Sequence, residues 1–167
     1  LVGSGSDQCT AIKLADYSNC DMFRIGRPNH ENEPVSVWFQ GFRLTMDETK
    51  QVAGCANIRL INFIRHSNFI DLFCYGASGW NIVTEVSEGF TIMSRNNYFH
   101  GVFCEKNNYG GMSIDHSYNL NIYFSYFGFA SRALESTASN YAGLRINMNS
   151  YNLKVVNNMW LQDCNKH

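Results

Sequence analysis

Proline and charged residues are scarce in this chain of 167 residues, and both shortages narrow its fold. There are two prolines, and only 16% of the residues are charged. Long solvent-exposed helices need many charged side chains, and no window shows a sustained 3.6-residue apolar period. The dipeptides Asn-Gly and Asp-Gly, which form the tightest β-hairpins, are absent. The composition therefore disfavours helical bundles and structures built from tight hairpins.

Excess charge of one sign is also lacking, because the formal net charge is −1. Such a chain has no electrostatic footprint for nucleic acid and no polybasic surface for anionic lipid. No apolar run reaches the length of a membrane span, and the first nine residues lack a charged segment followed by an apolar one. We therefore expect neither nucleic acid nor a membrane as a partner, and no motif implies a cofactor or a metal.

The six cysteines are widely scattered, and no Cys-x-x-Cys pair occurs. Cys74 and Cys104 lie in apolar, strand-like segments, where cysteine behaves as a small hydrophobic residue. A chain of this length also needs no disulfides to hold it together. The pattern favours free, buried thiols and folding in a reducing cytoplasm.

What is present in abundance is aromatic residues (twelve Phe, nine Tyr and three Trp) and asparagine. Strand-forming residues punctuated by Asn and Gly predict short strands joined by turns. These strands repeat. Asn-Tyr-Gly-Gly-Met-Ser-Ile-Asp at 108–115 recurs as Asn-Tyr-Ala-Gly-Leu-Arg-Ile-Asn at 140–147, an offset of 32 residues. Ser-Tyr-Asn-Leu at 117–120 recurs at 150–153, an offset of 33 residues, and weaker copies lie at 79–93 and 57–72.

Alternation along each strand assigns the side chains to faces. In the first strand of the units, the residues expected inside are Ile58/Leu60, Trp80/Ile82, Met112/Ile114 and Leu144/Ile146. In the second strand they are Ile70/Leu72, Phe90/Ile92, Leu120/Ile122 and Leu153/Val155, with Asp71, Thr91, Asn121 and Lys154 in a column outside. The turn asparagines Asn68, Asn119 and Asn152 are expected to form a ladder of side-chain hydrogen bonds.

Units of such small strands bury their apolar faces only by stacking. The repeat therefore predicts an all-β solenoid, a coil of parallel strands that forms one domain, 1–167. Residues 1–55 would enter the coil and residues 56–167 would form four repeat units; an antiparallel β-sandwich is the alternative. Since neither end offers a cap for exposed strand edges, we expect the chain to be incomplete at both ends, as a fragment of a longer spike.

Several segments are similar to segments of a known class of solenoid proteins. They are Gly-Ser-Gly-Ser at 3–6 with Thr-Ala-Ile at 10–12, the strand-like segments 21–26 and 35–42, and Ala-Asn-Ile-Arg-Leu-Ile-Asn-Phe at 56–63. Through them the chain resembles the pectin-lyase-like right-handed parallel β-helices, and among these the bacteriophage tailspikes with polysaccharide depolymerase activity. The resemblance implies a single-stranded right-handed β-helix, a homotrimer, and a place in the virion tail, outside cells, after synthesis in the host cytoplasm.

The resemblance also implies that the chain binds a bacterial capsule, exopolysaccharide or O-antigen and cleaves it, as a glycoside hydrolase or a polysaccharide lyase. Because this fold carries several activities, a non-catalytic carbohydrate-binding adhesin or structural spike is the alternative. No calcium-binding cluster of aspartates and no arginine-centred signature of the pectate lyases is visible.

Glycoside hydrolysis requires two carboxyl groups about 5–9.5 Å apart, and neighbouring strands of a coil are about 4.8 Å apart. Carboxylates within two turns of each other on one outward face therefore qualify. The candidates are Glu85, Glu105, Asp115 and Glu135. Glu105 and Glu135 close corresponding strands and lead as a pair, although each carboxylate alone also suits a solvated surface position.

A lyase would instead need a base for the proton beside a uronate carboxylate and a cation for the resulting enolate. The residues that could supply both are His116 with Asp115, Tyr118, Arg145 and Lys106, or His66 with Arg65. For substrate binding, equivalent tyrosines recur at Tyr109 and Tyr141 and at Tyr118 and Tyr151, and with Arg145 they are the candidates. Such rings stack on sugars, but they also stack on one another merely to cover a coil. Asp7, Asp16, Asp47 and Glu48 are expected to be turn or surface residues.

Overall fold

The computed structural model describes residues 1–3, 10–26, 34–62, 64–87, 94–128, 142–147, 149–156 and 160–162. In these ranges the chain forms β-strands, turns and isolated bridges. No helix capable of crossing a membrane occurs in this part of the chain. Every strand pair in it is parallel, which rules out the antiparallel sandwich for the described residues.

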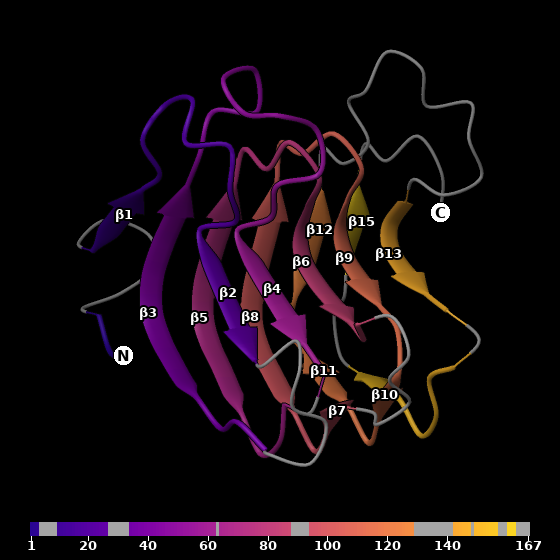
Figure 1. Cartoon of the computed structure of the whole chain (residues 1–167). Coiled ribbons are helices and arrows are strands. Elements are labelled where there is room, and N and C mark those ends of the chain that lie inside the picture. The colour runs from indigo at the N-terminus through magenta and orange to yellow at the C-terminus, as the bar shows by residue number, and fades with distance from the viewer. Residues whose placement is uncertain are drawn as a thin grey trace.

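The strands belong to three sheets (Figure 1). Sheet A contains, in spatial order, β1 (Ala11–Lys13), β3 (Trp38–Thr45), β5 (Asn68–Tyr75), β8 (Tyr98–Glu105), β11 (Asn121–Tyr123) and β14 (Lys154–Val156), with β12 (Tyr126–Gly128) beside β8 and β15 (Trp160–Gln162). Sheet B contains β2 (Phe23–Gly26), β4 (Ile58–Ile61), β6 (Trp80–Glu85), β9 (Gly110–Ile114) and β13 (Ala142–Ile146). Sheet C pairs β7 (Ser94–Arg95) with β10 (Ser117–Tyr118).

Successive stretches of chain visit the sheets in the same order. One pass runs through β5, β6 and β7, and the next runs through β8, β9 and β10, each strand lying parallel to its counterpart one pass earlier. Figure 1 shows sheets A and B as two facing layers, with the short strands of sheet C along one edge. This all-β, parallel arrangement is compatible with a parallel β-helix, and each pass is called a rung below.

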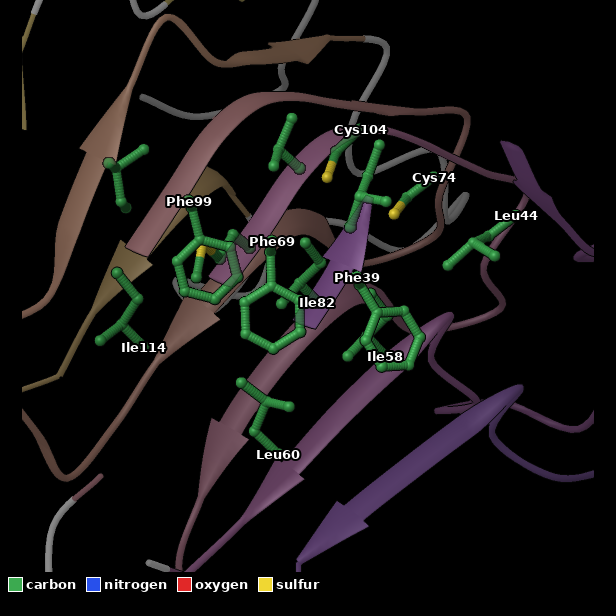
Figure 2. Packing of buried hydrophobic residues seen from close by; sticks show 14 of the residues in the cluster. Phe39, Leu44, Ile58, Leu60, Phe69, Cys74, Ile82, Phe99, Cys104 and Ile114 are labelled. Carbon is green, nitrogen blue, oxygen red and sulfur yellow. The ribbon is translucent and has the colours of Figure 1, made fainter. Parts of the chain in front are cut away.

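The core lies between sheets A and B, and equivalent residues stack along it from rung to rung. Phe39, Phe69 and Phe99 are in register, and the rings of Phe69 and Phe99 stack with centroids 4.6 Å apart and planes 8° apart. Figure 2 shows this row beside a second row, Leu44, Cys74 and Cys104, with Ile58 and Ile82 of sheet B opposite. Stacked rings of this kind contribute about 0.5–1.5 kcal/mol per pair beyond their burial.

Most of the residues expected inside the first strand of each unit are buried there, but Trp80 is not in the central core. Ile58, Leu60, Ile82, Met112 and Ile114 are fully buried. Trp80 packs in a separate cluster with Ala56 and Val83. The next residue, Asn81, is fully buried instead, and its amide accepts a hydrogen bond from Asn57 (2.7 Å) and donates one to the Glu105 carbonyl. Ile146 pairs in register with Ile114, on the same side of the sheet, but is 48% exposed.

Sheet A bends at one equivalent position in β3, β5 and β8 and between β11 and β12, which corrects the expected place of Ile70. Gly41, Asp71, Gly101 and Phe124 all have positive φ, between 47° and 73°. The residues that precede and follow the first three pair in register from strand to strand. This left-handed residue turns the strand, so Phe69 and Leu72 both face inward, while Ile70 shares an outer column with His100. In the following rung the same bend separates β11 from β12.

The expected turn ladder exists and includes Asn119 and Asn152 as predicted, with Asn96 and His66 in place of Asn68. The Asn119 amide donates to Asn96 Oδ1 (2.7 Å), Asn152 donates to Asn119 Oδ1 (2.9 Å), and Asn96 lies 2.9 Å from His66 Nε2. All four residues have φ between 51° and 55°, a conformation that asparagine tolerates better than most residues. Asn68, expected in the ladder, begins β5 instead and pairs with Tyr98. Phe90, Thr91 and Ile92 lie outside the described residues.

The cysteines of the described residues are free. Cys55, Cys74 and Cys104 are buried, as expected, and Cys20 is exposed. Burial first, and then the neighbouring Cys74 thiol, raises the pKa of Cys104 well above its ordinary value, and burial also raises that of Cys55. These three thiols are therefore packing residues.

Candidate functional site

The outward face of sheet A carries columns of aromatic side chains. Because the strands are parallel and in register, alternate residues stack into lines perpendicular to the strands. One line contains Trp38 and Tyr98, a second His100 and Tyr123, and a third Phe73, Phe103 and Tyr126. We call this set of residues, with Tyr75, the aromatic face. Trp38 is 52% exposed and Phe103 is 40% exposed, although large apolar rings are usually covered in a soluble protein.

The rings of the aromatic face contact one another within and between rungs. The Tyr98 and His100 rings are stacked and nearly parallel, with centroids 6.0 Å apart and an angle of 7° between their planes, and the Tyr98 centroid lies 5.3 Å from that of Tyr123. Beyond the bend, the Phe103 and Tyr126 rings are 6.0 Å apart. These contacts hold the rings in fixed orientations and leave them partly open to solvent, as a platform for a planar, apolar ligand face requires.

Cations lie over several of these rings. The Arg43 guanidinium is 5.0 Å from the Phe73 centroid, Lys106 Nζ is 5.4 Å from that of Tyr75, and Lys154 Nζ is 5.8 Å from that of Tyr123. Such cation–π contacts contribute about 0.5–1 kcal/mol each at exposed sites. They also place hydrogen-bond donors on the aromatic face, where a ligand with hydroxyl or carboxylate oxygens would meet them.

Glu105 ends β8 on the aromatic face, in register with Tyr75. Partial burial raises the pKa of its carboxyl group, and the charge of Arg43 opposes that rise. A carboxyl group that holds its proton to higher pH is suited to act as a general acid. Its predicted partner Glu135 lies outside the described residues, so the pair remains a prediction.

A second carboxylate is found at the turn that follows β3. Glu48 Oε1 lies 3.5 Å from Lys106 Nζ, although the two residues belong to rungs separated by a third. Gly76 makes this reach possible: a Cβ there would collide with the Met46 carbonyl and lie 3.5 Å from Glu48 Oε2. The Glu48 side chain is 11% exposed, and its Oε2 has no hydrogen-bond partner among the described residues. The sequence predicted a turn or surface residue here, and Glu48 is largely buried instead.

The residues predicted for lyase chemistry are divided between two places. His116 Nδ1 lies 2.9 Å from Asp115 Oδ1, close enough for charge contact but not aligned as a hydrogen bond. Burial lowers the pKa of Arg145, and the charge of Asp115 opposes that shift. Arg145 and Asp115 are therefore close enough to interact electrostatically. Lys106 is engaged with Glu48 instead.

Arg145 is held by the outward face of sheet B. It donates two hydrogen bonds to Ser113 Oγ, at 3.1 and 2.8 Å, and its guanidinium lies 4.7 Å from the Trp80 ring centroid. Tyr109 packs against the same cluster and is partly buried. Of the first predicted tyrosine column, Tyr109 therefore packs on the coil, and Tyr141 lies outside the described residues.

The remaining predicted residues lie on other faces. Tyr118 and Tyr151 form a parallel bridge beyond sheet C and are 45% and 53% exposed, so they do form an open column. Glu85 forms an ion pair with Arg59 on sheet B, whose terminal nitrogen lies 2.7 Å from Glu85 Oε2. His66 is engaged in the asparagine ladder. No group of His, Cys, Asp or Glu side chains that could hold a metal ion gathers within the described ranges.

The sequence patterns did not predict the aromatic face, because the repeat with the highest similarity between its copies lies in sheet B. A signal for it existed: Phe39, Phe69 and Phe99 are spaced by 30 residues, and Trp38, Tyr98, Gln40 and His100 flank them at alternate positions. Comparison with protein-family models, with curated proteins and with solved structures gives no match for this chain.

Proposed function

We propose that this chain is part of a right-handed parallel β-helix of the tailspike kind, which binds a bacterial surface polysaccharide on its aromatic face and cleaves it. The observation that carries the proposal is the set of ordered, partly exposed rings, with the cation of Lys154 over one of them, Tyr123. Sugar rings present apolar C–H faces to aromatic rings and oxygen atoms to cations. The right-handed coil is supported by the general handedness of connections between parallel strands.

On this proposal the protein is a homotrimer of the virion tail, folded in the host cytoplasm and active outside the cell. It acts without a cofactor, and its partner is the polysaccharide rather than nucleic acid or a membrane. Glu105 is the proposed general acid, because its raised pKa keeps the carboxyl protonated to higher pH than an exposed glutamate. Hydrolysis is preferred to elimination because Glu105 lies on the aromatic face, whereas His116 and Asp115 follow β9 of sheet B.

Binding is tested with a panel of purified capsular polysaccharides, exopolysaccharides and O-antigens. We expect Tyr98→Ala to weaken binding of the recognised polymer about tenfold, because one stacked ring contributes roughly 1 kcal/mol or more. Tyr17→Ala, at an exposed turn tyrosine, is the matched control. If Tyr118→Ala weakens binding and Tyr98→Ala does not, the ligand binds along sheet C and the aromatic face is the wrong site.

Cleavage is tested separately by the release of reducing ends and by the absorbance of unsaturated products. Glu105→Gln should abolish cleavage and leave binding intact, and Glu135→Gln tests the partner predicted from the repeat. Unsaturated products that disappear in His116→Ala would assign elimination and remove Glu105 from the chemistry. Binding without any cleavage in the unaltered protein would identify a non-catalytic adhesin.

A further inference from the structure

A hollow of about 460 Å³ opens on sheet B, away from the aromatic face. It lies over β2 and β4 and the turns that precede them, and its lining includes Cys20, Asp21, Arg24, Arg59 and Glu85. Small-molecule sites usually enclose about 300–1,000 Å³ and contain a few convergent polar groups. This hollow has the size for one or two sugar rings and a strongly polar lining.

Arg59 is locked at its centre. Its Nε donates to Asp21 Oδ2 at 2.7 Å, one terminal nitrogen to Glu85 Oε2 at 2.7 Å, and the other to the Gly54 carbonyl at 2.8 Å. The guanidinium side chain is 17% exposed; burial lowers its pKa, but Asp21 and Glu85 outweigh that effect and raise it. Asp21 is held in turn, because its Oδ1 accepts from the Ala56 amide at 2.8 Å. The centre is therefore charged and preorganised.

Arg24 lies beside Arg59 on the neighbouring strand, in register with it, and is exposed. Among the described residues it has no ion pair or hydrogen bond through its side chain. The two carboxylates of the hollow are already engaged by Arg59, and no carboxylate among the described residues forms an ion pair with Arg24. Five N–H donors of Arg24 and two of Arg59 therefore have no partner among the described residues.

We propose that this hollow binds a carboxylate-bearing sugar, a uronate, with its carboxylate between Arg24 and Arg59. A planar guanidinium and a carboxylate form paired hydrogen bonds, and Glu85 is left to accept from a sugar hydroxyl. The inference rests on the proposed function and extends it: the polysaccharide contains acidic residues, and the chain holds one of them at a point separate from the aromatic face.

The test uses Cys20, an exposed thiol in the lining. The rate at which iodoacetamide alkylates Cys20 is followed by peptide mass spectrometry with glucuronate, glucose or inorganic phosphate present. Glucuronate should slow the reaction about tenfold when its concentration is ten times its Kd, since only the empty hollow reacts. Glucose and phosphate at the same concentration should leave the rate unchanged.

Arg24→Gln should raise the Kd of glucuronate, measured from the protection of Cys20, about tenfold or more, because a charge-assisted pair is lost. Arg95→Gln, which removes the same charge from sheet C, should behave like the unaltered protein. Equal protection by glucose or by phosphate, or full protection of Arg24→Gln, would overturn the assignment to a uronate. Because this readout involves no polymer and no aromatic-face residue, it can fail while Tyr98→Ala still weakens polysaccharide binding, and the reverse also holds.

Discussion

At the scale of single residues, the environment of a side chain decides its chemistry more than its type does. Glu48, Glu85 and Glu105 are all glutamates near the ends of strands. Glu85 forms an ion pair with a partly buried arginine, Glu48 reaches a lysine two rungs away, and Glu105 ends an aromatic strand, where burial raises its pKa. The raised pKa suits Glu105 to the proposed role of general acid.

The raised pKa of Glu105 predicts a pH-dependent stability. The folded chain holds this proton to higher pH than the unfolded chain, whose glutamates titrate near pH 4.3, about the reference value. Folded protein therefore binds more protons in that interval, and the free energy of unfolding falls as the pH rises through the raised pKa. Urea denaturation of the Glu105→Gln variant between pH 4 and 7, roughly the range concerned, should show a smaller fall. Parallel curves for the two proteins would contradict the raised pKa.

At the scale of elements, turns and strands of neighbouring rungs support one another through identical contacts. The asparagine ladder joins three rungs at left-handed positions, and each inner member both donates and accepts. Asn119→Ala should lower the free energy of unfolding by about 2 kcal/mol, through two lost hydrogen bonds and an unfavourable φ. Asn119→Gly removes only the side-chain contacts, so it should cost less in chemical denaturation. An equal loss in both variants would show that the backbone conformation adds nothing.

The phenylalanine row is the corresponding device inside the coil. Phe69 is fully buried and stacks between Phe39 and Phe99. Phe69→Ala should lower the free energy of unfolding by about 3–5 kcal/mol, because a cavity opens in a packed core. Trp38→Ala removes a larger ring from the outward face of sheet A, next to Phe39, and should cost about 0.5 kcal/mol or less, as surface substitutions usually do. Comparable losses would mean that the aromatic face is covered in solution.

At the scale of the whole molecule, a stack of parallel rungs exposes one long face per sheet, and that of sheet A carries the exposed rings of Trp38 and Phe103. The proposed homotrimer predicts a sedimentation coefficient that corresponds to three chains for the complete protein. Its controls are concentration series, since a stable trimer keeps its mass on dilution. A monomer at all concentrations would remove the trimer from the proposal and leave ligand binding on the aromatic face to be tested as before.

The sequence by itself determined that the described part of the chain is all-β, that its units repeat, and which residues of β4 and β9, with Ile82 of β6, form the core. Alternation and repetition are local patterns, and they translate directly into buried faces. It did not determine the bend at Gly41, Asp71 and Gly101, which reverses the faces of Phe69 and Ile70. A single left-handed residue breaks the alternation without leaving a composition signal, since Asp at this position resembles any outward residue.

Only the tertiary structure decided which side chains meet. The aromatic face is assembled from residues about 30 apart, and one hollow is lined by Arg24 of β2, Arg59 of β4, Glu85 of β6 and Asp21 of the turn before β2. Such neighbours depend on the register between rungs. Turns of unequal length shift this register, and the sequence repeat alone does not show by how much. The scarcity of proline, charge and hairpin-forming dipeptides in the sequence thus indicated the kind of fold. The stacking of rungs created its sites, because a site requires distances that only the register between rungs sets.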